Sequence, residues 1–383
     1  MTDTVRSPDP AGERPGQVRP APPAAADPDA HPFVSVVVTA HDRHGFLRGA
    51  VESVLAQTLP PDQFEVLVVK FLHEPDLDSW LEDQKPRVRT LTDESLPRLG
   101  QKLARGIELA RGEIVCFLED DDRFVPQKLE TIVARFRPAP GLVYFRNRNR
   151  CIDASGRELV GPYARASNRE LGISGRRPPD LAVVDFIRHY GAEGNSSISI
   201  RRSTILPYLS RLTEFSTSTD WVLFVSALRS PGSLVLGTQV LSEYRLHDSF
   251  SQSPSHFARQ RLGAEIVRTG ESLFAMARGT RAERAARFLR GRGAVNWYLI
   301  DPRAIRPSLE KVRDAAWAAW LRREPTFIIQ IAWCGLRVLA PHAVSNAYWE
   351  YHRRDSVRQG WRIVGPGSSG GTQDRLPGDV PHG

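Results

Sequence analysis

The stretch Val34–Gln57, which reads VSVVVTAHDRHGFLRGAVESVLAQ, decides the fold class of this 383-residue chain. A nearly continuous β-branched run over residues 33–39 predicts a strand that is buried on both faces. Apolar residues then recur at helical spacing over residues 46–57, so a helix follows. Further strands are expected at 64–69 and 113–118, with a helix at about 101–110 between them. Strand, helix, strand, helix, strand predicts a parallel α/β sheet with crossover helices.

The remaining pattern divides the chain into four parts. More strands and helices continue the sheet domain to residue 254. The expected elements are a helix to about 136, a strand at 142–146, a polar loop to about 179, a strand at 197–201, a helix at 221–228 and strands at 234–236 and 240–245. Residues 255–362 show a helical pattern. Residues 1–32 and 363–383 have the composition of a disordered arm and a disordered tail.

Composition narrows the class of protein and of partner. With 41% hydrophobic and 25% charged residues, the chain is expected to be globular with one sizeable core. A formal net charge of +8 favours anionic partners such as nucleotide diphosphates or phospholipid headgroups. The basic residues are scattered and form no nucleic-acid motif, so the sequence predicts no nucleic-acid partner.

Cysteine usage and the N-terminal sequence predict a cytoplasmic location. The three cysteines are far apart and odd in number, which gives neither a disulfide framework nor zinc-ligand spacing. Residues 1–31 lack the apolar core of a secretory signal. Peripheral attachment to the inner face of the membrane is the alternative that remains open.

An acidic run, Glu119-Asp120-Asp121-Asp122, follows the strand expected at 113–118. In such sheets ligands lie beyond the carboxyl ends of the strands, where residues 39–43 and Lys70 also fall. Four consecutive acids repel one another strongly in a low dielectric unless something positive is bound. A divalent cation beside a pyrophosphate would remove that cost. Acids that cap the next helix are the alternative, and the run alone leaves both open.

Several motifs in order resemble family 2 glycosyltransferases of the GT-A fold. The matching stretches are 34–57, 65–69, 100–113, 117–130 (with FLEDDDRFVPQKLE at Phe117 to Glu130), Thr219-Asp220-Trp221 and Tyr244-Arg245-Leu246-His247. The resemblance covers roughly residues 33–253. It implies a Rossmann-like nucleotide-diphospho-sugar transferase domain with a C-terminal helical appendage. The implied activity, in glycan biosynthesis, is transfer of a sugar from a nucleotide-diphosphate donor to an acceptor hydroxyl with inversion, assisted by Mn²⁺ or Mg²⁺.

The resemblance also assigns roles to individual residues. Glu119 and Asp121 match the acids of the family's D-x-D motif, and Asp220 matches the catalytic base. The residues expected to bind the donor are Thr39, Ala40, His41, Arg43, Lys70, Lys102, Glu119 and Asp120. The residues expected to hold the metal are Asp121, Asp122 and His247.

Elementary chemistry is consistent with these roles and also offers plainer ones. A sugar hydroxyl needs a carboxylate to accept its proton, and the leaving diphosphate is stabilised by a metal and nearby cations. Asp220, however, could simply cap the helix that begins beside it, with or without a catalytic role. His247 could be an ordinary surface histidine, and Lys102 a solvated helix residue.

Three positions depart from the family pattern. Lys70 stands where most relatives carry acids that contact the base, so the donor base is open, with a UDP-sugar as the prior expectation. Thr219 replaces the glutamate that often precedes the catalytic aspartate, and Glu119 replaces the first D-x-D acid. The acceptor, whether glycan, lipid-linked or small molecule, cannot be read from the sequence.

Other classes of function compete with the transferase hypothesis. A non-catalytic protein that binds a nucleotide-sugar or glycan fits the altered Lys70 region, although Asp121 and Asp220 are retained. A nucleotidyltransferase would carry a glycine-rich loop after the first strand, which residues 39–45 do not provide. A peripheral membrane scaffold would depend on residues 327–354. The apolar stretch 327–339 is too short to span a bilayer and is expected to be a core helix, with membrane-interface contact as the alternative.

Overall fold

The computed structural model describes most of the chain from residue 31 onward. The described residues are 31–41, 45–160, 169–175, 178, 180–189, 191–192, 194–247, 256–301, 303–322, 325–358 and 362–363. All of these described residues belong to one compact unit. The disordered arm, the loop residues 161–168 and most of the tail that the sequence predicts lie outside the described residues.

Four parallel strands form one half of the sheet. They are β1 (Val34–Ala40), β2 (Phe64–Lys70), β3 (Val88–Thr92) and β4 (Ile114–Glu119), in the order β4-β1-β2-β3. Thr39 of β1 lies beside Glu119, and Ala40 lies beside Lys70. The carboxyl ends of β1, β2 and β4 therefore meet at one edge, as the sequence predicts.

The other half of the sheet is mixed. Its strands are β5 (Arg123–Phe124), β6 (Leu142–Ile152), β7 (Glu158–Val160), β8 (Leu171–Ile173), β9 (Ile198–Arg201), β10 (Ser233–Arg245) and β11 (Arg362–Ile363). The antiparallel strand β9 joins β4 to β6, and β10 runs parallel to β6 while it pairs antiparallel with β5. A register shift between Leu236 and Val240 interrupts β10, where the sequence predicts two separate strands. At Gly237 a Cβ atom would lie 2.6 Å from the Phe145 ring, so this close approach requires glycine.

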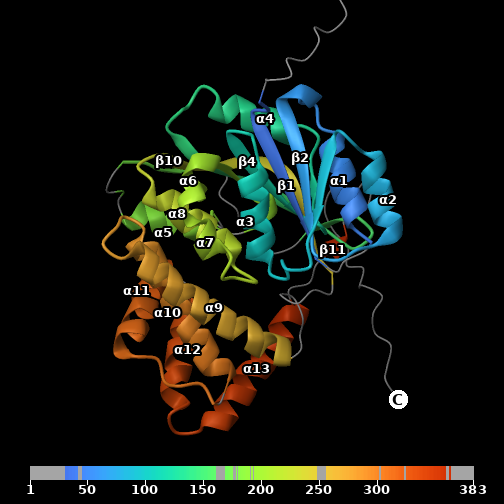
Figure 1. The fold of residues 1–383 in the computed structure, drawn as a ribbon. Coiled ribbons are helices and arrows are strands. Elements are labelled where there is room, and N and C mark those ends of the chain that lie inside the picture. The colour runs from blue at the N-terminus through green and yellow to red at the C-terminus, as the bar shows by residue number, and fades with distance from the viewer. Residues whose placement is uncertain are drawn as a thin grey trace, which may run out of the picture. The chain divides into compact units, whose positions relative to one another are not determined.

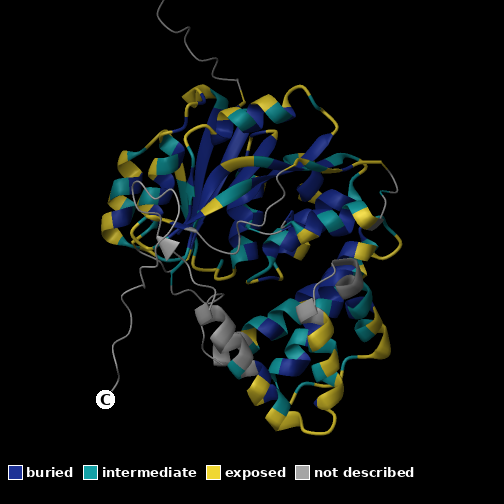
Figure 2. Ribbon diagram, turned by 180° about the vertical axis from the view of Figure 1, so that it is seen from behind, coloured by how far each residue is buried: buried dark blue, intermediate teal, exposed yellow. Residues whose placement is uncertain are grey.

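Helices cover both faces of the sheet, which explains the uninterrupted apolar sequence of β1. The helices are α1 (Leu47–Leu55), α2 (Pro75–Asp83), α3 (Leu99–Leu109), α4 (Lys128–Phe136), α5 (Asp180–Arg188), α6 (Arg202–Ile205), α7 (Leu209–Leu212) and α8 (Thr219–Arg229). Val36 and Val38 join the core shared with α1 and α4, whereas Val37 joins the core shared with α3 and α8. Figures 1 and 2 show these layers, with the strands buried between the helices.

The sequence does not predict α2 and β3. Helix α2 buries only Leu77 and Leu81, and its other residues are polar, so its apolar periodicity is weak. Strand β3 fully buries only Val88, because it is the last strand at this edge of the sheet. Tertiary packing rather than local pattern places both elements.

Five helices follow the sheet domain. They are α9 (His256–Ala277), α10 (Glu283–Ile300), α11 (Leu309–Arg322), α12 (Pro325–Leu336) and α13 (Pro341–Arg358). Helix α10 contacts each of the other four (Figure 1). It also packs against α8, because Phe288 stacks on Trp221 with ring centroids 6.1 Å apart. Among the described helices, none is long and apolar enough to cross a membrane.

Candidate active site

The acidic run turns sharply where β4 ends. The backbone N–H of Asp122 donates to the Glu119 carbonyl at 3.2 Å, and the chain then enters the short strand β5. This turn brings one carboxylate oxygen from each of Glu119, Asp121 and Asp122 within 4.8 Å of one another. The sequence therefore folds three of its four consecutive acids into a single cluster at the carboxyl edge of the sheet.

Asp122 is the most buried member of this cluster. Its carboxylate accepts a hydrogen bond from the backbone N–H of Arg245 at 2.9 Å. Burial, and then the charges of Asp121 and Glu119, raise the pKa of Asp122 well above its usual range. The cluster is thus short of positive charge.

The end of β10 supplies two side chains that contact Asp121. The Arg245 guanidinium donates from Nε to the Asp121 carbonyl at 2.7 Å. His247 Nε2 lies 2.8 Å from Asp121 Oδ2, and only 11% of the His247 side chain is exposed. The Phe46 ring contacts both, since Arg245 lies over it at 4.7 Å and the His247 ring is 5.2 Å away. The alternative that His247 is an ordinary surface residue is wrong.

The residues after β1 reach the same edge. The backbone N–H of His41 donates to Asp120 Oδ2 at 2.8 Å, and Lys102 Nζ lies 3.4 Å from His41 Nδ1. The Phe71 ring lies beside both, 5.8 Å from the His41 ring and 5.6 Å from Lys102 Nζ. Lys102 is only 1% exposed, so the alternative of a solvated helix residue is wrong. Arg43, also predicted to bind the donor, lies outside the described residues.

Lys102 can be buried because α3 packs very closely on β1. A Cβ atom at Gly106, one turn further along α3, would lie 2.3 Å from a methyl carbon of Val37. Only glycine permits this approach, which holds Lys102 beneath His41 at the strand end.

Lys70 is turned toward a partner on α2. Its buried ammonium forms an ion pair with Asp78 and donates to the Leu72 carbonyl at 2.6 Å. Although burial opposes it, hydrogen bonding from Lys70 and from the Glu74 N–H lowers the pKa of Asp78 below its usual value. The expected contact between Lys70 and the donor stays a prediction.

Asp220 lies in the first turn of α8. Its carboxylate accepts hydrogen bonds from the backbone N–H groups of Trp221 at 2.9 Å and Gly194 at 2.8 Å. Gly194 has a φ of +83°, a conformation that favours glycine and that aims its N–H at Asp220. These two bonds fix the orientation of the carboxylate. Helix α8 begins at Thr219 with Ser218 as its N-cap, so the alternative that Asp220 caps the helix is wrong. A carboxylate in the first turn still interacts favourably with the helix dipole, which is compatible with a catalytic role.

Asn195, which the sequence did not single out, connects Asp220's helix to the acidic cluster. Its side-chain amide donates to Glu119 Oε1 at 2.7 Å and to Thr219 Oγ1 at 2.9 Å. Thr219 precedes Asp220, at the position where the resemblance places a glutamate. The sequence of residues 193–197 is compatible with a role in shaping the acceptor site and with an ordinary tight turn, and no local pattern reveals a partner 76 residues away.

A buried cation, Lys128, lies below the cluster and was also not predicted. Its ammonium donates to the Ser196 carbonyl at 2.6 Å and to Ser242 Oγ at 3.0 Å. Ser196 in turn accepts a hydrogen bond from the backbone N–H of Glu119 at 3.1 Å. Complete burial lowers the pKa of Lys128 to about 7. A lysine on a helical pattern is ordinarily interpreted as solvated, so no sequence signal marks Lys128 as buried.

The donor atoms of this cluster fit a divalent metal. Carboxylate oxygens from Glu119, Asp121 and Asp122 are ligands that Mg²⁺ and Mn²⁺ prefer, and a histidine nitrogen beside them also suits Mn²⁺. The crowding that raises the pKa of Asp122 would be relieved by a bound cation. The arrangement can therefore bind a metal and an anionic group next to a carboxylate, Asp220, that can accept a proton.

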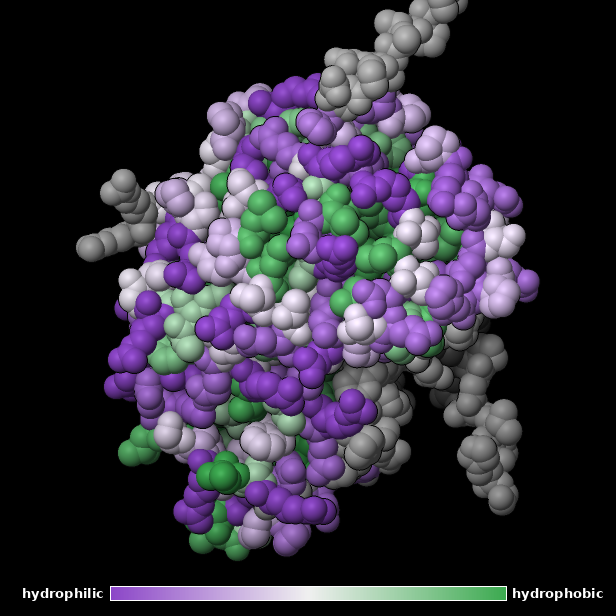
Figure 3. Space-filling model, in the orientation of Figure 1, coloured by the Kyte–Doolittle hydropathy of each residue, from purple (hydrophilic) through white to green (hydrophobic). Residues whose placement is uncertain are grey.

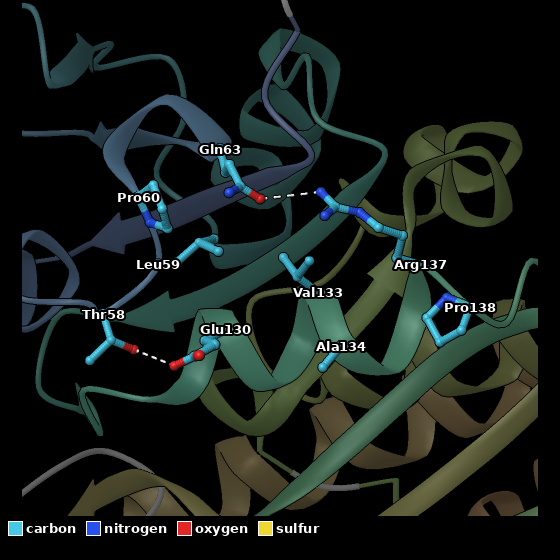
Figure 4. A pocket seen from close by; sticks show the side chains of 9 residues that line it. All are labelled: Thr58, Leu59, Pro60, Gln63, Glu130, Val133, Ala134, Arg137 and Pro138. Carbon is cyan, nitrogen blue, oxygen red and sulfur yellow. Dashed lines mark hydrogen bonds between the residues drawn. The ribbon is translucent and has the colours of Figure 1, made fainter. Parts of the chain in front are cut away.

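Two hollows on the described surface lie away from these residues. One, of about 490 Å³, lies between α4 and residues 58–63, where Thr58 bonds to Glu130 and Gln63 bonds to Arg137 (Figure 4). Another, of about 480 Å³, is lined by residues of β8 and α5. Neither hollow includes a predicted site residue. The candidate site is the set of contacting residues at the carboxyl ends of the strands.

Comparison with known proteins gives a family and related chains. The family model described as Glycosyl transferase family 2 matches residues 35–174. The O-antigen biosynthesis protein RfbC of Myxococcus xanthus is 26% identical over 199 residues, which are 51% of this chain and 14% of that protein. The uncharacterized protein MT1568 of Mycobacterium tuberculosis (strain CDC 1551 / Oshkosh) is 27% identical over 170 residues, which are 43% of this chain and 51% of that protein. The chain thus spans about half or less of these relatives' own length.

The fold is similar to that of a chain of known structure. The S. aureus TarS 1–349 structure, determined in complex with UDP-GlcNAc, superposes with a TM-score of 0.50 at 12% sequence identity. The match covers 83% of this chain and 91% of that chain. This likeness confirms the predicted α/β GT-A fold with its C-terminal helices.

Proposed function

We propose, from the match of residues 35–174 to the glycosyl transferase family 2 model, that the protein transfers a sugar from a nucleotide-diphosphate donor to an acceptor hydroxyl. One observation carries the proposal: three carboxylates that could hold a metal ion are joined through Asn195 to the helix that carries Asp220. The donor site and the proposed catalytic base thus belong to one hydrogen-bonded unit.

The donor would lie along the carboxyl edge of β1 and β4. His41 offers an exposed ring on which a nucleoside can rest, while Thr39 and Ala40, which precede it, are buried and hold this end of β1 in place. Lys102 supplies a cation beside the His41 ring. Asp120 is held by the His41 N–H, so its placement depends on the same loop. The Lys70 ammonium pairs with Asp78 and so gives no indication of which nucleobase binds. The nucleobase of the donor therefore stays open among uracil, guanine and thymine.

Asp121, Asp122 and His247 are the residues that would hold the divalent metal, with Glu119 beside them. When bound, the cation offsets the negative charge that collects on the leaving diphosphate. Arg245 holds the Asp121 backbone in place, and so keeps the carboxylate oriented toward His247. These residues bind and position the reacting diphosphate end of the donor.

Asp220 would act as the catalytic base. The acceptor oxygen forms a bond to the anomeric carbon while the bond from that carbon to the diphosphate oxygen breaks, and the acceptor proton passes to the Asp220 carboxylate. The backbone bonds from Gly194 and Trp221 hold the carboxylate ready for this step. A single displacement from the side opposite the leaving group inverts the anomeric configuration, and nucleoside diphosphate is the second product.

The test measures sugar transfer by the full chain with Asp220→Asn. We expect kcat to fall by about 10²–10⁴-fold, while KM for the donor changes little, since the amide keeps the shape but cannot take the proton. NMR of the product should show the anomeric configuration inverted relative to the donor.

Asp185→Asn is the matched control, because Asp185 is a helical aspartate on α5 that pairs with His189 and Arg169 away from the site. It should leave kcat unchanged. Unchanged turnover in Asp220→Asn, or a product that retains configuration, would contradict the assigned role. Donor binding without any transfer by the wild type would favour the non-catalytic alternative.

A further inference from the structure

The exposed large hydrophobic side chains of the described residues are concentrated in one short stretch. Seven of the ten lie between residues 305 and 339, and they include the most exposed, Leu309 at 89%, Ile305 at 87% and Leu339 at 83%. The other three, Leu181, Leu206 and Val240, are separated from one another in sequence. Such concentration in the helical region, rather than scatter, indicates an interaction surface.

Helix α12 is apolar on both of its sides. Ile331, Trp333 and Cys334 pack against the small core formed by α10, α11 and α13. On the other side Ile328, Ala332 and Leu336 follow one another at a spacing of four residues, and all three are exposed, as is Ile329. A helix that is apolar all round is normally buried or in contact with lipid. In this structure one side of α12 is covered and the other is not.

Two neighbouring segments extend this apolar side. The chain leaves α12 through Val338 and Leu339, which are exposed, and Arg337 Nη2 donates to the Asp301 carbonyl at 2.5 Å. That bond places the start of the loop that carries Ile305 beside the end of α12. We name the set Ile305, Ile328, Ile329, Leu336, Val338 and Leu339 the apolar surface. Figure 3 shows hydrophobic side chains standing among hydrophilic ones on the helical region.

Charge identifies the partner that this surface fits. Residues 256–358 contain nineteen arginines and lysines against nine aspartates and glutamates, a net charge of +10, whereas the whole chain carries +8. The basic excess therefore belongs entirely to the helical region. Arg303, Arg306 and Arg313 are exposed on either side of Ile305 and Leu309 in the sequence. A soluble polyanion would be attracted by the charge but would gain nothing from the exposed aliphatic side chains.

We propose that the apolar surface and its flanking arginines dock the protein onto an anionic lipid bilayer. At twelve residues α12 is about 18 Å long, well short of the roughly 30 Å hydrocarbon layer, so it would lie in the interface along its exposed side. The arginines contact the lipid phosphates while the aliphatic side chains enter the headgroup boundary. This docking does not depend on the proposed sugar transfer, because it uses no residue of the candidate active site.

The test is flotation of the full chain with vesicles, in the absence of any donor. One vesicle set is phosphatidylcholine alone, and the other contains about 30% phosphatidylglycerol to supply the anionic surface. We expect binding to the anionic vesicles that weakens at about 0.5 M NaCl, because salt screens the attraction. The variant Ile328→Ser/Leu336→Ser/Leu339→Ser should bind at least about tenfold more weakly.

The control variant Leu181→Ser/Leu206→Ser replaces exposed leucines outside the apolar surface and should bind as the wild type does. Circular dichroism and urea unfolding check that both variants fold. If the triple variant does not fold, Arg303→Gln/Arg306→Gln/Arg313→Gln takes its place and should lose the preference for anionic vesicles.

Three outcomes would overturn the proposal. They are absence of wild-type binding to either vesicle, equal binding by the folded triple variant, and self-association of the wild type in light scattering that the triple variant abolishes. The last would show that a second copy of the chain, not lipid, covers the apolar surface.

Discussion

Asn195→Ala is the perturbation that separates the candidate site's architecture from ordinary core packing. Asn195 is 5% exposed, and its amide holds Glu119 of the acidic cluster and Thr219 of α8 at the same time. Its removal cuts the direct side-chain link between the acidic cluster and the helix that carries Asp220.

The size of the effect follows from the two bonds that are lost. A hydrogen bond to a charged acceptor contributes about 1.5–3 kcal/mol to stability, and one to a neutral hydroxyl contributes about 1 kcal/mol. The variant should therefore lose about 2–4 kcal/mol of unfolding free energy. Because a misplacement of about 1 Å can lower turnover by about 10²-fold, kcat should fall by one to two orders of magnitude in the fraction that is folded.

Urea unfolding and steady-state transfer measure these two quantities on the same samples. Asn149→Ala serves as control, because Asn149 is half-buried and bonds only weakly, to Arg146 at 3.4 Å. It should change the unfolding free energy by less than about 0.5 kcal/mol. A normal kcat in folded Asn195→Ala protein would refute this reasoning. It would show that Asn195 contributes only packing.

Three further variants test other parts of the structure. Folding lowers the pKa of Lys128 from 10.5 to about 7, so between pH 7 and pH 10.5 the unfolded chain binds more protons than the folded protein. The free energy of unfolding of the wild type should therefore rise with pH across this range. Lys128→Met should remove that rise in urea titrations, and an unchanged slope would contradict the lowered pKa of Lys128. A lysine at position 245 cannot reproduce the hydrogen bonds that Arg245 donates to the Asp121, Asp153 and Ala154 carbonyls. In Arg245→Lys, the metal affinity measured by calorimetry should therefore fall at least about tenfold. An affinity equal to that of the wild type would show that Arg245 does not orient Asp121. Asp314→Ala leaves the buried Arg290 with the half-exposed Glu310 as its ion-pair partner among the described residues, and should cost about 3 kcal/mol in thermal or urea unfolding. Glu310→Ala should cost clearly less, because that pair is exposed to solvent, and equal losses would mean that the buried pair is not the stabilising one.

The sequence predicted the parallel half of the sheet well, because β1, β2 and β4 are buried on both faces and therefore read as apolar runs. It predicted two strands where β10 is one, because the residues around Gly237 look like a break although the bulge there keeps the pairing with β6. It missed α2 and β3, whose buried residues are too few to form a pattern.

The candidate site was predictable where its residues follow a strand end in the family's motifs. His41, Asp120, Asp121 and His247 are brought together as expected, since parallel strands end at one edge. Asn195 could not be found, since its partners Glu119 and Thr219 are distant in sequence and no local pattern marks a buried amide. The exposed side of α12 could not be predicted either, because an apolar sequence does not say how much of it the neighbouring helices cover.

The most direct test of the central claim is calorimetry of UDP, GDP and dTDP binding to the full chain, with Mn²⁺ and with EDTA. The account predicts that one nucleoside diphosphate binds in the presence of the metal, that EDTA removes this binding, and that Asp121→Ala weakens it at least about tenfold. Asp62→Ala, an exposed acid before β2, should bind as the wild type does. Binding that is equal with EDTA, or a folded wild type that binds none of the three with Mn²⁺, would contradict the metal-assisted donor site.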